Sequence, residues 1–251
     1  MNAHSLAAAV ALFIVGADLT AVRAADAIDR VTRTIPLTQG TPIHIDATIA
    51  ELTVTGSDRQ DLSVEIVRRA PSSTDLAKFP AVVDQGTGGV RIGIVQADDG
   101  KDPTLKAEVV ISAPATAIFQ AIRVFEGRVK LTNLKTACDV DIRRGPIEAS
   151  GLAGRVRLES GIGSIDLKQS ELTTGGMMRL RIFNGPIRVR FTHPPPNGRI
   201  LAVTFNGTLT SDIPLTMKDK FGPRFGETTL GTGDPVMSID DVKGDISIKV
   251  G

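Results

Sequence analysis

Six arginines are the residues of this sequence whose type and spacing could do chemistry. They form three pairs, each spaced by one residue: Arg155 and Arg157, Arg179 and Arg181, and Arg188 and Arg190. Side chains two positions apart on a β-strand share a face, and guanidinium groups suit carboxylate and phosphate groups. Residues 123–190 hold 13 Lys or Arg against 7 Asp or Glu, a net charge of +6, whereas the whole chain is +1. The pattern predicts a basic strip that holds anionic groups of a polysaccharide or lipopolysaccharide.

An alternative interpretation gives the same arginines no function. Glu148, Glu159 and Asp166 alternate with them in the sequence. Exposed ion pairs of this kind contribute little stability and are common on protein surfaces. The sequence favours this interpretation over the basic strip.

Asp139 and Asp141 are a second candidate, because two carboxylates on one strand face could hold a metal or perform acid and base chemistry. Their neighbours Cys138 and Val140 are expected to point inward. The aspartates are therefore predicted to be surface charges, and Cys138 a buried small hydrophobic residue. None of the three histidines has metal-ligand spacing, and no catalytic serine elbow, P-loop or dinucleotide fingerprint is present. The sequence therefore predicts no catalytic residue, no metal site and no cofactor.

The elements that must position these residues follow a repeat built on glycine. Glycines at positions 127, 145, 163 and 185 are 18, 18 and 22 residues apart, and Gly207 follows 22 residues later. Each is flanked by apolar residues spaced by one, as Val156, Leu158, Ile165 and Leu167 flank Gly163. A fixed period near 20 residues is typical of stacked coils. The prediction is an all-β protein, a single-stranded parallel β-solenoid (β-helix) with coils of about 18–22 residues.

An antiparallel β-sandwich or barrel is the alternative fold. Asn184-Gly185 and Asn206-Gly207 are good two-residue hairpin turns. Against it, Pro186 would fall directly after such a turn, where an interior strand needs its backbone N–H. Gly145-Pro146 raises the same difficulty.

Composition narrows the function classes. The 251 residues include 25 Gly and 9 Phe, but no Trp or Tyr, and the net charge is close to zero. Surfaces that bind nucleic acids or sugars usually depend on aromatic stacking. Surfaces that bind nucleic acids also need a positive charge. No nucleic-acid partner is therefore expected. A single Cys excludes an internal disulfide.

The first residues have the pattern of an export signal. Residues 6–17 form an apolar run too short to span a bilayer, and Val22-Arg23-Ala24 offers a cleavage site. The predicted organisation is a signal peptide at residues 1–24 and one domain at residues 25–251. The mature chain should have no membrane span, and it should be periplasmic, secreted or on the cell surface.

The repeated Gly-x-Ile/Val-x-apolar unit and the ending around Gly231-Thr232-Gly233 and Gly244-Asp245-Ile246 resemble a bacterial family of exported β-solenoid proteins named putative adhesins, whose function is unknown. The resemblance covers residues 35–250. It implies a non-enzymatic interaction module of the cell envelope or surface. Its partner would be an anionic polysaccharide or another envelope protein.

The rival function is a polysaccharide-active β-helix enzyme. Such an enzyme needs clustered acids in a groove and, usually, aromatic sugar subsites. The acids predicted to be exposed are scattered along this sequence, and Trp and Tyr are absent. The non-enzymatic interpretation is therefore preferred.

Overall fold

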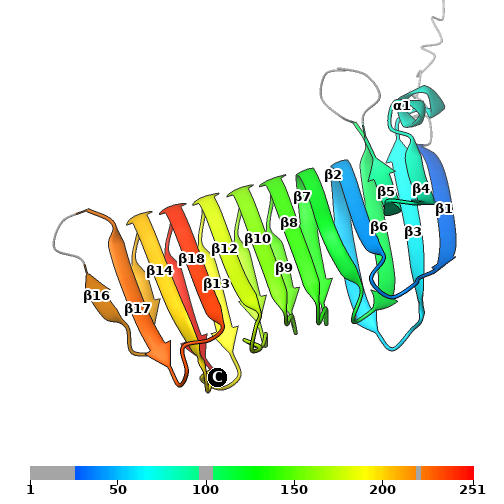
Figure 1. The fold of residues 1–251 in the computed structure, drawn as a ribbon. Coiled ribbons are helices and arrows are strands. Elements are labelled where there is room, and N and C mark those ends of the chain that lie inside the picture. The colour runs from blue at the N-terminus through cyan, green and yellow to red at the C-terminus, as the bar shows by residue number, and fades with distance from the viewer. Residues whose placement is uncertain (1–25, 96–103, 219–221) are drawn as a thin grey trace, which may run out of the picture.

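Strands make up most of the computed structural model, which describes residues 26–95, 104–218 and 222–251. The molecule is an elongated array of strands, with its one labelled helix near the end where the chain begins (Figure 1). The first part comprises β1 (Ala27–Pro36), β2 (Pro42–Ser57), β3 (Asp61–Ala70), α1 (Ser73–Ala77), β4 (Ala81–Gly86), β5 (Gly89–Ile94) and β6 (Lys106–Pro114).

No helix in the described ranges is long and apolar enough to cross a membrane. The predicted signal peptide, residues 1–24, lies outside the described residues.

The rest of the array contains shorter strands. Its middle comprises β7 (Ile118–Thr132), β8 (Ala137–Arg144), β9 (Ile147–Ser150), β10 (Arg155–Ile162), β11 (Ile165–Lys168), β12 (Met177–Asn184) and β13 (Ile187–Phe191). Its last part comprises β14 (Gly198–Asn206), β15 (Leu209–Ser211), β16 (Thr216–Lys218), β17 (Arg224–Leu230), β18 (Val236–Lys243) and β19 (Ile246–Val250).

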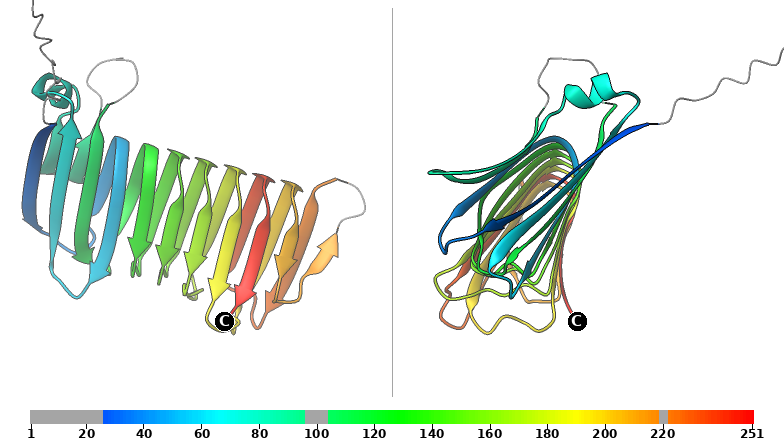
Figure 2. Two further views of the ribbon diagram at one scale, coloured as in Figure 1. Left: turned by 180° about the vertical axis from the view of Figure 1, so that it is seen from behind. Right: turned by 90° about the vertical axis from the view of Figure 1, so that its right-hand side faces the viewer.

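The strands form two layers that meet at one long edge. One layer runs β8, β10, β12, β18 and β14, and the other runs β9, β11, β13, β19 and β15, all in parallel pairs. The longer strands β2 and β7 continue through both layers. Viewed along the array, the strands arch over at one edge, and loops emerge at the other (Figure 2, right). We refer to the β10 layer and the β11 layer.

The core lies between the two layers and is built from aligned aliphatic rows. Ile147, Ile165, Ile187 and Ile246 are register partners on successive strands of the β11 layer, and all are fully buried. Burying an isoleucine side chain contributes about 1.5–3 kcal/mol. The alternation of buried and outward residues expected from the sequence is confirmed along these strands.

The repeated glycines lie at the arched edge, where the chain passes from one layer to the other. In spatial order, the row comprises Gly127, Gly145, Gly163, Gly185, Gly244 and Gly207. At Gly185 the backbone has φ +132°, and a Cβ atom would collide with the carbonyl oxygen of Gly163 on the next strand. The repeat is therefore a consequence of close backbone approach at this corner. Asn184-Gly185 is not a hairpin turn, because β12 and β13 each pair with other strands.

The predicted single-stranded parallel β-solenoid is wrong. The 19 strands form one mixed sheet, which is mostly parallel but has antiparallel pairs toward both ends, such as β1 with β3 and β14 with β17. The sheet is open, since among the described residues β1 and β16 each pair with one neighbour only. Chain order is also broken, because β18 lies between β12 and β14.

The physical reason for this error is that the glycine period reports the corner that each strand turns and not which strand lies beside it. The alternative of an antiparallel sandwich or barrel describes the two facing layers and the antiparallel pairs better, although most pairs are parallel. The Gly-Pro pairs counted against hairpins, such as Gly145-Pro146 between β8 and β9, lie at the corner.

Candidate anion-binding surface

Four of the six predicted arginines lie together on the outer side of the β10 layer. Arg157 on β10 is the register partner of Arg179 on β12. Arg155 precedes this position on β10, and Arg181 follows it on β12, each by two residues. Adjacent strands are about 4.8 Å apart, so the four guanidinium groups share one small area.

Arg157 is held by two acids. It donates hydrogen bonds to Glu159 at 2.7 and 3.0 Å and to Asp139 at 3.2 and 3.3 Å. Burial alone would lower the pKa of Arg157, but these hydrogen bonds outweigh it and raise the pKa above its usual value. For this arginine the ion-pair interpretation of the sequence describes the structure.

The other three arginines of this area form no side-chain hydrogen bond to an acid among the described residues. The Nε atom of Arg179 is buried, lies 3.9 Å from Asp240 in an ion pair, and has no hydrogen-bond partner among the described residues. Arg155 and Arg181 are exposed, and neither takes part in an ion pair within the described part of the chain. Although Arg181 lies between Glu159 and Asp240 in register, these acids contact Arg157 and Arg179 instead.

A hollow of about 540 Å³ opens beside these side chains. Arg155, Arg157 and Arg179 line it, together with Gln120 and Met177. Asp139 also lines the hollow, but Arg157 binds this carboxylate. The arrangement offers several N–H donors to an anionic group entering from solvent.

The remaining pair, Arg188 and Arg190, lies on β13 in the opposite layer and cannot join this area. Arg188 forms an ion pair with Asp166 at 3.4 Å. Arg190 is exposed, and its register partners are the cations Lys168 and Lys249. Lys249 is paired with Asp212, which leaves Lys168 and Arg190 as the two cations of this row without an ion pair in the described ranges.

The predicted roles of Cys138, Asp139 and Asp141 agree with the structure. Cys138 is buried, and burial raises the pKa of its thiol to about 12. Asp139 and Asp141 lie partly exposed on the outer face, with Arg157 and Arg123 beside them. Among the described residues, no three His, Cys, Asp or Glu side chains are placed to hold a metal ion.

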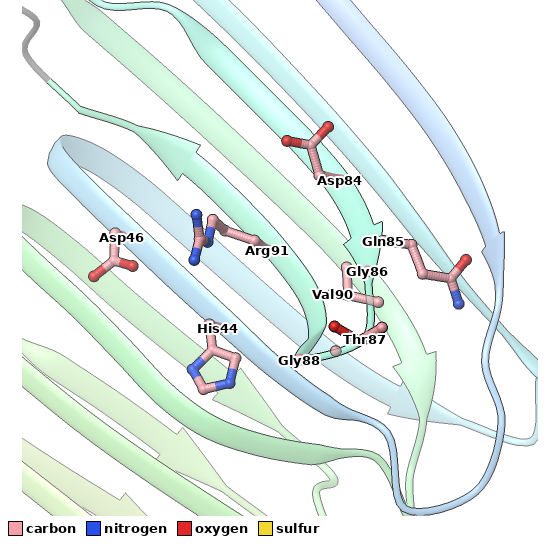
Figure 3. A pocket seen from close by; sticks show the side chains of 10 residues that line it. His44, Asp46, Asp84, Gln85, Gly86, Thr87, Gly88, Val90 and Arg91 are labelled. Atoms are coloured by element: carbon pink, nitrogen blue, oxygen red, sulfur yellow. The ribbon is translucent and has the colours of Figure 1, made fainter.

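Sequence reasoning missed a polar hollow of about 410 Å³ under the β4–β5 hairpin. His44 and Asp46 of β2 and Arg91 of β5 line it, and Arg91 extends toward Asp46 (Figure 3). No hydrogen bond or ion pair between described residues joins these three side chains. They are therefore not an organised catalytic set. The hollow lies between β2 and the β4–β5 hairpin, and nothing in the sequence signals it.

No family model and no curated protein sequence matches this chain. Its fold is similar to that of a putative cell adhesion protein from Clostridium sporogenes, with a TM-score of 0.53 and 11% identity, over 90% of this chain and 100% of that one. A putative adhesin from Bacteroides fragilis (13% identity, TM-score 0.36) and a putative lipid binding protein from Parabacteroides distasonis (11% identity, TM-score 0.31) each match over 89% of this chain and 97% of theirs. At such identities the likeness to the Clostridium protein shows the fold alone, and it is in keeping with the resemblance to putative adhesins.

Proposed function

We propose that the protein is a non-enzymatic, exported interaction module of the cell envelope, which binds anionic polysaccharide through the outer side of the β10 layer. One observation carries the proposal. Arg155, Arg157 and Arg179 line a single hollow, and Arg155 is exposed and forms no ion pair among the described residues. Its N–H donors are available to carboxylate or sulfate groups of a polymer.

Arg157 has a distinct part in this proposal. Its hydrogen bonds to Asp139 and Glu159 fix its side chain before any ligand arrives. The neighbouring Arg155 on β10 and Arg181 on β12 then supply positive charge that no ion pair balances among the described residues, whereas Arg179 is paired with Asp240. Because these groups are at the surface, binding would depend on charge and weaken as salt is added.

The rival proposal, a polysaccharide-active enzyme, has less support. Its chemistry needs a pair of carboxyl groups placed about a sugar bond, yet the acid in the arginine hollow, Asp139, is bound to Arg157. Incubation with acidic and neutral polysaccharides distinguishes the two proposals. Released reducing or unsaturated ends would support the enzyme, and their absence alongside retention of the polymer would support the binding module.

Export forms a separate part of the proposal. It supposes that residues 1–24 are a signal peptide and that residues 25–251 are the mature protein in the periplasm, outside the cell or on its surface. The apolar run at residues 6–17 and the small residue Ala24 support it. Expression of the full chain in a bacterium, followed by fractionation and N-terminal sequencing, tests it. A periplasmic or extracellular product beginning at Ala25 is expected.

Retention on a column of immobilised anionic polysaccharide tests the binding surface. The variant with Arg155→Ser and Arg179→Ser should elute at a clearly lower salt concentration than the wild type. Its matched control carries Arg33→Ser and Arg69→Ser, which removes two exposed arginines that form no ion pair among the described residues. The control loses the same charge, so equal shifts for both variants would mean that retention reflects net charge and no particular site.

A third variant, with Arg188→Ser and Arg190→Ser, tests which of the two layers carries the binding surface. These arginines lie on β13, on the other side of the molecule. We expect retention to change little. A loss confined to this variant would place the binding surface on the β11 layer instead.

A further inference from the structure

The arched edge of the molecule carries an exposed row beside the buried glycines. We name the two residues that precede each glycine of the corner row the corner ridge. In register, the ridge crosses six strands in the order β7, β8, β10, β12, β18 and β14. At about 4.8 Å per strand, the ridge is a straight line about 24 Å long.

Large apolar side chains stand out of this ridge. Phe183 is 62% exposed, Phe205 58%, Ile162 52% and Phe125 51%. All exposed phenylalanines of the described residues are on the ridge. Phe183 and Phe205 flank Val242, which lies on the strand between theirs. Apolar side chains gathered on one exposed line mark a contact surface.

Cations without ion pairs lie among these apolar groups. Arg143, Arg144 and Lys243 are exposed, and none takes part in an ion pair in the described part of the chain. Arg144 rests over the ring of Phe125 at 5.8 Å from its centroid. The single acid of the ridge is Glu126, at its β7 end. Elsewhere on the outer face the acids Asp141, Glu159 and Asp240 are matched by arginines.

The charge and shape of the ridge decide what it contacts. A second copy is disfavoured, because two ridges facing each other would bring the same free cations together. The edge is convex, since the strands arch over it (Figure 2, right). A straight convex line of phenylalanines with free cations beside them matches an anionic lipid surface, where apolar side chains enter the acyl boundary and cations bind phosphate.

We propose that the corner ridge docks onto the surface of an anionic lipid bilayer. Phe183, Phe205 and Ile162 enter the boundary between headgroups and acyl chains. Arg143, Arg144 and Lys243 contact lipid phosphates. This surface is distinct from the arginine hollow, so the two proposals stand or fall separately.

The absence of Trp from the chain allows a direct test. Phe183→Trp places one tryptophan on the ridge, and Val110→Trp places one at an exposed position of β6, away from the corner. Each full-length variant is mixed with phosphatidylglycerol and phosphatidylethanolamine vesicles that contain brominated lipid. The tryptophan at residue 183 should shift to shorter wavelength and be quenched, whereas that at residue 110 should do neither. Because depth is read at one residue, attachment through another segment cannot imitate the result.

Charge dependence completes the test. Arg143→Ser with Arg144→Ser, added to Phe183→Trp, should reduce partitioning into these vesicles by about tenfold or more. Vesicles of phosphatidylcholine should give weak quenching with either protein. An unquenched tryptophan at residue 183 would overturn the proposal. Equal quenching with anionic and neutral vesicles would overturn its anionic part.

Discussion

The carbonyl oxygen of Gly163 occupies the place that a Cβ atom on Gly185 would need, because the two glycines lie side by side directly after β10 and β12, where the chain turns the corner. The same relationship links Gly145 to Gly127. The obstacle is backbone, which cannot move aside without parting the strands. Gly185→Ala should therefore destabilise the fold by about 3 kcal/mol or more, measured by urea denaturation.

Gly88→Ala is the matched control for this prediction. Gly88 lies in the turn between β4 and β5, and a Cβ atom there would meet no atom within 4 Å. The free energy of unfolding of the Gly88→Ala variant should stay within about 0.5 kcal/mol of that of the wild type. Similar losses for the two variants would refute the close-approach explanation of the glycine repeat.

The core prediction compares two adjacent residues on β11. Ile165 is fully buried in the isoleucine row, so Ile165→Asp would bring an unpaired charge into it. The protein should fail to fold, as judged by circular dichroism. Asp166 points outward and pairs with Arg188, and Asp166→Ala should cost less than about 1 kcal/mol. Comparable effects at both sites would show that inward and outward positions are wrongly assigned.

A buried acid should make stability depend on pH. Asp241 lies in an interior row between Ile182 and Thr204, and neither carboxylate oxygen has a hydrogen-bond partner among the described residues. Burial raises the pKa of Asp241 to about 6; the nearby backbone N–H of Lys243, although not in hydrogen-bond geometry, offsets part of this effect, and the charge of Asp245 adds to it.

The direction of the pH effect follows from this shift. Between about pH 4 and 6 the folded state keeps a proton that the unfolded chain has lost, so stability falls as pH rises and levels off above pH 6. The raised pKa of Asp241 corresponds to at most roughly 3 kcal/mol of lost stability above pH 6. Asp241→Asn should stabilise the protein at pH 7.5 and flatten the profile between pH 4 and 6. A variant with the wild-type profile would show that another group titrates.

Local features of this fold could be predicted from the sequence, and the pairing of strands could not. Alternation identified Ile165 as interior and Asp166 as outward, because a strand presents successive side chains to opposite faces. The glycine period located the corners. Neither pattern reveals that β18 inserts between β12 and β14. Gly207 and Gly244 both belong to the corner row, and the glycine pattern does not say which of them lies beside Gly185.

The candidate site was predictable to a similar extent. Spacing by two residues identified which arginines share a face, and in the structure both members of each pair lie on one face of one strand. Whether Arg157 or Arg155 is free depends on which acids lie on the next strand, as Asp139 does for Arg157. The corner ridge was missed, because sequence reasoning followed the apolar residues that alternate around each glycine and gave no role to Phe183, which lies two residues before Gly185.

Calorimetric titration with an oligogalacturonate tests the central claim most directly, with an uncharged oligosaccharide of equal length as the reference. Wild-type protein should bind the anionic chain and ignore the neutral one. The variant with Arg155→Glu and Arg179→Glu should lose at least about tenfold in affinity, while Arg33→Glu with Arg69→Glu should retain most of it. Undiminished affinity in the first variant would contradict the assignment of binding to the arginine hollow.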